Sequence, residues 1–407
     1  MNFDTSTNYP IIKNAQEYMY EEKFISISSQ DINLTKYNAN DFEIELPQDY
    51  CNVQSIKLAS ITFPNSLDNF SVLLNNVKMS FIINIPYYPD TTLPNYTYLY
   101  AIYTALYSKY ISSNPYYVVQ ISDGIYSNSQ LSTELTNIFN ESVSSYIIDY
   151  FTSIGDTINL NTFISLGEYT EFVINNNVIN QQMYFGNKSS GFILTNDSLL
   201  NISVDNNICS ANGVHQPVIT GNLGLLPYYL GFGYKNVPIQ STPYTSIKPL
   251  RFNYLPGTSG NWLLPSYPNN PVYCVISPLK ISVYGSKYYI YMEISGFNSI
   301  DETLPMQPLA ENITGNNGVV NNSFAKIPLY TNPNVPENNI FYNNVIDNPV
   351  KIFNPPLTKI RRLRIKFRYH IGNLVQLDGL TYSFTLKLNI FLPQNSKKYT
   401  MYTPESR

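Results

Sequence analysis

Two groups of side chains in this sequence have residue types and a spacing that could do chemistry. Glu43 and Glu45 are carboxylates two residues apart, and a pair of carboxylates is what a glycoside hydrolase needs. The segment 359–370 is cationic, because it holds six of the 24 lysines and arginines of the chain and one of its two histidines. Such a segment could bind phosphates or the acidic surface of another protein.

The carboxylate pair is predicted to lie on the solvent face of a strand. Glu43 and Glu45 alternate with apolar residues in the segment 41–47, so one side of this strand would be buried and the other wet. No histidine, and no nucleophile with a base beside it, lies near either acid in the sequence. We therefore predict no catalytic residue and a protein that is not an enzyme, and we keep a glycoside-processing enzyme as a minor alternative.

The cationic segment is also predicted to be a strand, with one cationic and one apolar face, because alternate residues of a strand share a face. The cationic face, which we name the cationic ridge, consists of Arg362, Arg364, Lys366, Arg368 and His370. The apolar face consists of Leu363, Ile365, Phe367 and Tyr369. The ridge either docks a partner surface or pairs with neighbouring acids and deters edge-to-edge association of sheets. We hypothesise that it is a partner-contact site.

Signatures of metal, phosphate and nucleophile chemistry are missing from the sequence. It contains no GxGxxG, GxxxxGK[ST], GxSxG, HExxH or DxDxDG motif. His215 and His370 are far apart, so we predict no metal site, and no cofactor is expected. The wide spacing of the cysteines favours buried, free thiols in a reducing compartment; these are Cys51, Cys209 and Cys274.

The composition indicates a folded protein with a neutral, tyrosine-rich surface. Charged residues make up 13% of the 407 residues, about half of the usual share, whereas tyrosine alone occurs 37 times. A net charge of −4 gives no global attraction to nucleic acid, and a hydrophobic share of 43% argues against disorder. No stretch approaches the roughly 18 apolar residues of a membrane-spanning helix, and the first residues lack the apolar centre of a signal peptide. We therefore expect a protein made inside the cell without a transmembrane segment.

The elements that must position these residues are predicted to be mostly β. Short β-branched and apolar runs bounded by Asn, Pro, Asp and Ser are typical of strands separated by turns. Strands are predicted at 41–47, 53–63, 79–85, 157–164, 170–174, 272–277, 280–284, 287–294, 363–369 and 381–391. Helical spacing of apolar residues predicts one or two short helices, at 129–143 and 96–110.

The chain is predicted to consist of consecutive segments. Seven prolines and the single tryptophan, Trp262, fall in 236–271, which is therefore a connector or a long loop. The other segments are an arm at 1–22, a β-sandwich domain at 23–235, a second β-rich domain or a continuation of the same sandwich at 272–392, and a tail at 393–407.

Four blocks of the sequence together resemble one family of proteins. They are 24–66, 121–141, 225–236 with its Leu230-Gly231-Phe232 core, and 323–329 followed by 353–391. On these blocks the sequence resembles the minor capsid or capsid-associated structural proteins of nucleocytoplasmic large DNA viruses, the giant viruses. The resemblance implies an antiparallel, jelly-roll-like β-sandwich, one or two of them packed, and shell building in place of catalysis.

The resemblance also implies where the protein works and what it binds. We expect a virion structural protein, a minor capsid or vertex-type component made in the host cytoplasm. It would contact the major capsid protein, other minor capsid proteins or a second copy of itself, through the cationic ridge and the terminal segments 1–22 and 394–407. Nucleic acid is not an expected partner. The alternative is a carbohydrate-binding attachment module on a viral particle, in which Trp262 and adjacent tyrosine pairs stack on sugars.

Overall fold

The structure, a computed structural model, shows which of these elements form and how they pair. It describes residues 20–64, 67–74, 76–195, 225–232, 239–244, 250–251, 261–283, 289–299, 322–329, 340–342, 350–369 and 374–391. The predicted mostly β class is confirmed. Every strand pair among the described residues is antiparallel.

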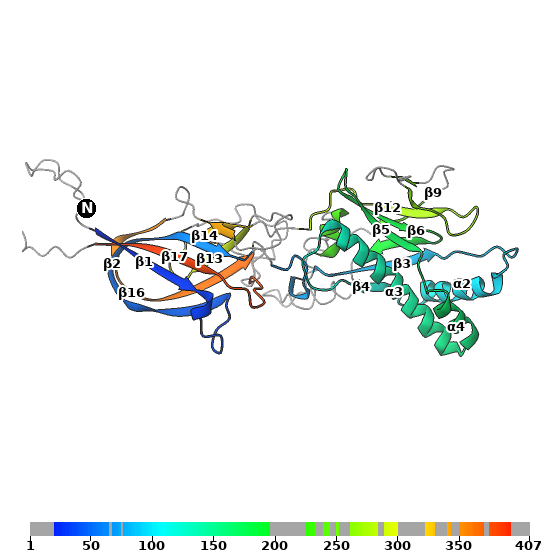
Figure 1. Cartoon of the computed structure of the whole chain (residues 1–407), viewed down its shortest axis with the longest axis horizontal. Coiled ribbons are helices and arrows are strands. Elements are labelled where there is room, and N and C mark those ends of the chain that lie inside the picture. The colour runs from blue at the N-terminus through cyan, green and yellow to red at the C-terminus, as the bar shows by residue number, and fades with distance from the viewer. Residues whose placement is uncertain are drawn as a thin grey trace, which may run out of the picture. The chain divides into compact units, whose positions relative to one another are not determined.

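The chain divides into two compact units (Figure 1). Unit 1 comprises Met1–Ser66, Ser286–Gln307 and Asn316–Arg407, and unit 2 comprises Leu67–Gly285 and Pro308–Gly315. This division differs from the predicted consecutive domains, 23–235 and 272–392. The physical reason is strand pairing, because strands near the N-terminus form hydrogen-bonded pairs with strands near the C-terminus.

Unit 1 contains a seven-stranded antiparallel sheet with the order β1-β17-β2-β16-β13-β14, in which β15 also pairs with β2. The strands are β1 (Tyr20–Ser28), β2 (Asp41–Phe63), β13 (Tyr289–Ile294), β14 (Ala325–Pro328), β15 (Ile340–Tyr342), β16 (Val350–Tyr369) and β17 (Ser383–Phe391). In Figure 1 the blue strands β1 and β2 lie beside the orange and red strands β16 and β17. β1 begins at Tyr20, so the last three residues of the predicted arm 1–22 belong to this strand. Residues 1–19 lie outside the described residues.

The strand β2 is longer than predicted, because Pro47 does not end it. The register against β16 shifts between the pairs Glu45↔Arg362 and Tyr50↔Ile360, and Pro47 lies within the shift. At such an irregularity the missing N–H of proline removes no hydrogen bond from the ladder. The strands predicted on either side of Pro47 are therefore one strand.

The apolar face of this sheet holds the core of unit 1. The predicted alternation in β16 is confirmed, since its apolar side chains are at most 2% exposed: Leu363, Ile365, Phe367 and Tyr369. The ring of Phe367 lies 5.2 Å from that of Phe63 and 4.9 Å from that of Tyr382, so three segments meet in one aromatic cluster. Burial of this face turns the opposite face of β16 towards solvent.

Unit 2 contains two four-stranded sheets, β4-β3-β7-β8 and β5-β6-β12-β9, and the two-stranded sheet β10-β11. The strands are β3 (Lys78–Ile85), β4 (Tyr117–Gln120), β5 (Phe172–Asn177), β6 (Gln182–Asn187), β7 (Gly191–Thr195), β8 (Ile239–Gln240), β9 (Thr242–Tyr244), β10 (Leu250–Arg251), β11 (Asn261–Leu263) and β12 (Val272–Ile276). Residues 280–283, predicted to lie in a strand, form none. The ring of Phe172 on β5 lies 4.9 Å from Phe81 on β3 and 5.2 Å from Phe192 on β7. The two sheets thus share a core, which confirms the predicted β-sandwich.

The longest helix, α3 (Asn128–Ile154), contains the helix predicted at 129–143. Ser127 begins it with a capping box, in which the Ser127 hydroxyl accepts from the Gln130 N–H and the Gln130 side chain accepts from the Ser127 N–H. Gly155 ends it in the left-handed conformation, with a φ of 71°. Its buried apolar side chains recur every four residues; they are Leu131, Leu135, Phe139, Val143, Ile147 and Phe151.

Polar side chains on α3 protect β5, which is the edge strand of its sheet. The Asn140 side chain donates to the Phe172 carbonyl oxygen and accepts from the Phe172 N–H, both at 2.9 Å. The Thr136 hydroxyl donates to the Ile174 carbonyl oxygen at 3.1 Å and accepts from the Ile174 N–H at 3.0 Å. These bonds occupy the backbone groups that an edge strand offers to a further strand. At Phe172 and Ile174 this edge therefore cannot pair with a further strand.

Two shorter helices belong to unit 2, α2 (Tyr96–Ile111) and α4 (Thr157–Ser165). The first confirms the helix predicted at 96–110. The second shows that the strand predicted at 157–164 is wrong, because Asp156 caps a helix by accepting from the Asn159 N–H at 3.1 Å. The described residues thus form three α-helices, more than the one or two short helices predicted. None of these three is long and apolar enough to span a membrane.

Short stretches of the proline-rich segment 236–271 belong to the sheets of unit 2. In this segment β9 pairs with β12, and β11 pairs with β10. Trp262 and Leu263 on β11 are buried against Val272 and Cys274 of β12. This segment therefore contributes to a sheet and to a small apolar cluster in addition to connecting elements.

Candidate partner-contact site

The cationic ridge lies on the exposed side of β16, as the alternation predicts. The exposed fraction of the side chains falls along the strand and is 63% for Arg362, 54% for Arg364 and 24% for both Lys366 and Arg368. A register shift between Ile360 and Arg362 places Arg361 on the exposed side as well. His370, the remaining residue of the ridge, lies outside the described residues.

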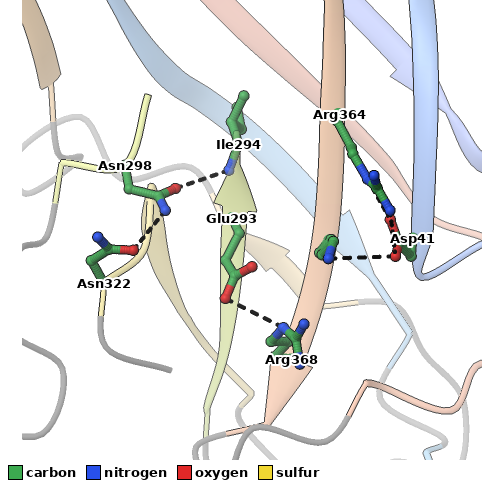
Figure 2. Close-up of polar contacts among 8 residues, drawn as sticks. Asp41, Glu293, Ile294, Asn298, Asn322, Arg364 and Arg368 are labelled. Atoms are coloured by element: carbon green, nitrogen blue, oxygen red, sulfur yellow. Dashed lines mark hydrogen bonds and ion pairs between the residues drawn. The ribbon is translucent and has the colours of Figure 1, made fainter. Parts of the chain in front are cut away.

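Acidic side chains from two neighbouring strands pair with the ridge. Asp41 on β2 accepts from Nε and Nη2 of Arg364, each at 3.2 Å (Figure 2), and its Oδ2 lies 3.6 Å from Nζ of Lys366. On the other side of β16, Oε1 of Glu293 on β13 lies 3.3 Å from Nε of Arg368 (Figure 2). The register brings these residues together, since β16 pairs with β2 along one edge and β13 along the other. The hydrogen bond to Asp41 raises the pKa of Arg364.

The carboxylate pair that could serve a glycoside hydrolase also pairs with β16. Oε1 of Glu45 accepts from Nε of Arg361 at 2.8 Å, and Oε1 of Glu43 lies 3.7 Å from Nη1 of Arg362. Both acids lie on the solvent side of β2, as predicted, opposite the buried Phe42. Ion pairing within the sheet accounts for the two carboxylates without an acid–base role.

The charges of this surface nearly cancel. Six cations on β16 face five acids, which leaves a net charge of +1; the acids are Asp41, Glu43, Glu45, Asp49 and Glu293. So small a net charge attracts phosphates or acidic proteins weakly at a distance, although the exposed guanidinium groups can donate at short range. The pairing of the ridge with neighbouring acids is therefore what the structure shows, and contact with a partner stays a prediction. The segment alone cannot reveal the cancellation, because Asp41 lies 323 residues before Arg364.

Asp41→Asn is expected to lower the free energy of unfolding of unit 1 by about 0.5–1 kcal/mol, because two partly exposed cations, Arg364 and Lys366, lose a shared partner. The loss should shrink in 1 M salt, since the Debye length falls from about 10 Å at 0.1 M to about 3 Å. Urea unfolding followed by circular dichroism at both salt concentrations measures it. Glu45→Gln, which removes a more exposed carboxylate, should cost less, and equal, salt-independent losses for the two variants would contradict the pairing.

A row of four tyrosines on α2, two of them exposed and two half-buried, is a second candidate surface, which the sequence reasoning missed. We name Tyr96, Tyr100, Tyr103 and Tyr107 the tyrosine row. Neighbouring rings of the row lie 5.7–5.8 Å apart, and Tyr88 packs edge-on at 5.0 Å from Tyr103. Tyr100 and Tyr107 are 42% and 43% exposed, while the opposite side of the helix is buried. The spacing of four, three and four residues, which places side chains on one helix face, is the signal that finds this row.

The tryptophan expected to stack on sugars is buried. Trp262 is 8% exposed, and its ring lies 5.4 Å from that of Tyr184 in an edge-on arrangement. Tyr117 and Tyr229, from two of the adjacent tyrosine pairs, are buried as well. These side chains pack the interior of unit 2, so the expectation that they present stacking surfaces is wrong for them.

The structure also places two of the three cysteines. Cys274 is buried, and its burial raises the pKa of its thiol. Cys51 is exposed, so the predicted burial is wrong for this residue. The next residue of β2, Asn52, has a φ of 55°, which makes the strand irregular at this point. Cys209 and His215 lie outside the described residues. Within the described ranges, no three His, Cys, Asp or Glu side chains gather in a way that could hold a metal ion.

Similarity to known proteins is found in structure and not in sequence. No family model and no curated protein matches the chain. It is similar to a chain in the cryo-EM structure of the Sputnik virophage, with 11% identity and a TM-score of 0.36, over 91% of this chain and 98% of that chain. It is also similar to the mavirus penton protein, with 8% identity and a TM-score of 0.36, over 92% of this chain and 99% of that chain. Both structures are of viral proteins, and identities and TM-scores this low establish neither the family, the activity nor the partners of this chain.

Proposed function

We propose that this chain is a non-enzymatic structural protein of a virion, a minor capsid or vertex-type component that contacts neighbouring capsid proteins and stabilises the shell. The observation that carries the proposal is the tyrosine row, a partly exposed aromatic surface on α2. Aromatic side chains are enriched, and lysine and glutamate depleted, at the cores of protein interfaces. The resemblance of the blocks 24–66 and 353–391 to capsid-associated proteins supports the same function.

The proposed partners are the major capsid protein, other minor capsid proteins of the particle or a second copy of this chain. Tyrosine rings bury a large apolar area at a low loss of side-chain entropy, and their hydroxyls can keep a hydrogen bond at the rim. The cationic ridge on unit 1 would form a separate, more polar contact, in which Arg362 and Arg364 donate to acceptors of a partner. Most of the binding energy would then come from the tyrosine row, and the ridge would add specificity.

The double variant Tyr100→Ser, Tyr107→Ser is expected to reduce incorporation of the protein into particles by at least about tenfold. Truncation of an aromatic residue at the centre of an interface costs about 2 kcal/mol or more, and about 1.4 kcal/mol corresponds to a factor of ten. The measurement is quantitative mass spectrometry of particles purified from cells that express a tagged copy. Ile158→Ser, which removes an exposed apolar side chain of α4, is the control and should be incorporated like the unchanged protein.

Equal incorporation of the tyrosine variant and the unchanged protein would contradict the role of the row. The same assay tests the ridge with Arg364→Glu and Lys366→Glu combined, once circular dichroism shows that this variant is folded. Unchanged incorporation of the folded variant would remove the ridge from the contact surface. Absence of the unchanged protein from purified particles would refute the virion function itself.

The second candidate function is a carbohydrate-binding attachment module, and the exposed rings of the tyrosine row favour it. Aromatic faces can stack on sugar rings, and this row presents several of them on one helix. A glycan array separates the two functions. Glycan binding that is lost in Tyr100→Ser, Tyr107→Ser, together with unchanged incorporation into particles, would establish attachment in place of shell contact.

A further inference from the structure

Unit 2 contains a cavity of about 100 Å³ beside α2, and four tyrosines are among the residues that line it. Tyr98 lies on α2 and Tyr87 on the segment before it. Tyr169 lies on the turn before β5, and Tyr267 lies on the loop between β11 and β12. Glu168 and Thr170 also line the cavity and are exposed, so a ligand can reach it from solvent.

The aromatic wall of the cavity is held in place by its own contacts. The rings of Tyr87 and Tyr267 are stacked, with centroids 4.0 Å apart and planes 2° from parallel. The Tyr87 N–H donates to the Ser190 hydroxyl at 3.1 Å, and the Asn270 side chain donates to the Ser189 carbonyl oxygen at 2.9 Å. The first bond holds Tyr87 at the turn 189–190. The second holds the loop of Tyr267 at the same turn, because the Tyr267 carbonyl oxygen accepts from the Asn270 N–H at 3.3 Å. The wall therefore exists before any ligand binds.

Glu171 lines this cavity, and one of its carboxylate oxygens is left without a partner in the described part of the chain. Its Oε2 is buried and has no hydrogen-bond partner among the described residues. Lys188 does not pair with this carboxylate oxygen. Its Nζ donates to the Thr170 carbonyl oxygen at 2.9 Å. Burial and the charge of Glu171 raise the pKa of both Tyr169 and Tyr267, so these hydroxyls stay protonated and neutral. A buried carboxylate oxygen without a partner is unfavourable, and a rotation of the Glu171 side chain that brings this oxygen to a cation in the cavity would relieve this.

We propose that this cavity binds the ammonium group of a slim alkylamine, with Glu171 as its counter-ion and the surrounding tyrosines as its walls. An ammonium group can donate to the carboxylate and to phenol oxygens, and aromatic rings attract cations through their π faces. An anion would be repelled by Glu171. A lysine side chain of another polypeptide and a free amine both present this chemistry. The inference does not rest on the proposed virion function.

The size of the cavity limits the ligand. A cavity of about 150 Å³ accepts a benzene molecule, and a cavity needs a volume of about 10–15 Å³ to hold one water. A volume of about 100 Å³ is therefore smaller than the cavity that accepts benzene and suits a slim aminobutyl group. This separates the cavity from the tyrosine row, whose exposed rings could accept a larger partner.

The test is a ligand-observed NMR titration of the full chain with n-butylammonium chloride, and with n-butanol as the neutral probe of the same shape. We expect n-butylammonium to bind and n-butanol to bind at least tenfold more weakly. Glu171→Gln, which keeps the shape and removes the charge, should weaken n-butylammonium binding at least tenfold. Glu141→Gln on the exposed face of α3 makes the same change in net charge and should leave binding unchanged.

Three results would overturn the proposal: no binding of n-butylammonium, equal binding of n-butanol, or undiminished binding by Glu171→Gln. The comparison of the two probes uses the unchanged protein, so it decides the question even where the variant does not fold. A parallel titration with N-acetyl-lysine N-methylamide distinguishes the sources of the ligand. Tighter binding of the lysine derivative supports a lysine of a polypeptide, and tighter binding of n-butylammonium supports a free amine.

Discussion

Phe81→Ala is expected to lower the free energy of unfolding of unit 2 by about 3–5 kcal/mol, the range for removing a fully buried phenylalanine. Phe81 on β3 has no exposed surface, and its ring is stacked on Phe139 of α3 at 4.4 Å and on Tyr117 of β4 at 5.0 Å. It also meets Phe172 of β5 edge-on at 4.9 Å. Alanine would leave a cavity where both sheets and the longest helix meet, so the loss includes the contacts of all three.

The single tryptophan makes this effect measurable in unit 2 alone. Trp262 is the only tryptophan of the chain and is buried in unit 2, so its fluorescence follows the unfolding of this unit in guanidinium chloride. The midpoint should fall strongly for Phe81→Ala. Phe24→Ala, which removes an exposed phenylalanine of unit 1, is the control and should leave the Trp262 transition in place. A loss below about 1 kcal/mol for Phe81→Ala would show that the two sheets do not share this core.

Gly231→Ala is expected to destabilise unit 2 by about 3 kcal/mol or more, through backbone strain and a steric clash together. Gly231 has a φ of +90°, which L residues with a side chain rarely adopt. A Cβ at this position would lie 2.3 Å from the carbonyl oxygen of Leu279, which is a backbone atom. The two segments are also joined by a hydrogen bond from the Leu279 N–H to the Gly231 carbonyl oxygen at 3.0 Å. They cannot separate to admit the methyl group without weakening this bond.

Gly155→Ala is the matched control for the strain alone. Gly155 also has a positive φ, of +71°, and a Cβ there would meet no atom within 4 Å. This variant should therefore lose about 1 kcal/mol, from the left-handed conformation only. The difference between the two variants, measured by Trp262 fluorescence in the same denaturant, isolates the clash with Leu279. Equal losses would mean that the approach of residues 231 and 279 is not close.

The contact of Gly231 gives a physical reason for one block of the family resemblance. Leu230, Gly231 and Phe232 are all buried, and the backbone of this segment lies against residues 277–279. A glycine is required where the main chain of a second segment approaches this closely. The block thus reports how unit 2 is packed, and it carries no information about what the protein binds.

The paired ridge and the tyrosine row suggest different kinds of contact. On unit 1, arginines and acids already neutralise each other across three strands, so this surface offers directional hydrogen bonds and little net charge. On unit 2, the tyrosine row offers apolar area and few charges. A partner that buries the row gains more free energy than one that covers the ridge, since exposed ion pairs contribute little.

Local order was determined by the sequence itself. The apolar residues of α3 recur with the period of a helix, and the alternation from Leu363 to Tyr369 places charges on one side of a strand. These features depend on neighbouring residues only, because backbone geometry sets how side chains are distributed along an element. The mostly β class and the exposed position of the ridge could be predicted for this reason. Even local reasoning failed at 157–164, where the Asp156 cap outweighs the β-branched residues.

The partners of each element were decided only by the tertiary structure. Asp41 meets Arg364 because β2 and β16 pair over a separation of 323 residues, and no local pattern encodes that register. Because of the same pairing, β2 continues past Pro47, and both ends of the sequence belong to unit 1. Glu171 and the tyrosines that line the same cavity come together from α2, the segment before it, the turn before β5 and the loop between β11 and β12. Long-range contacts depend on the packing of whole sheets and helices, so one sequence shows which residues are available and the fold selects which of them meet.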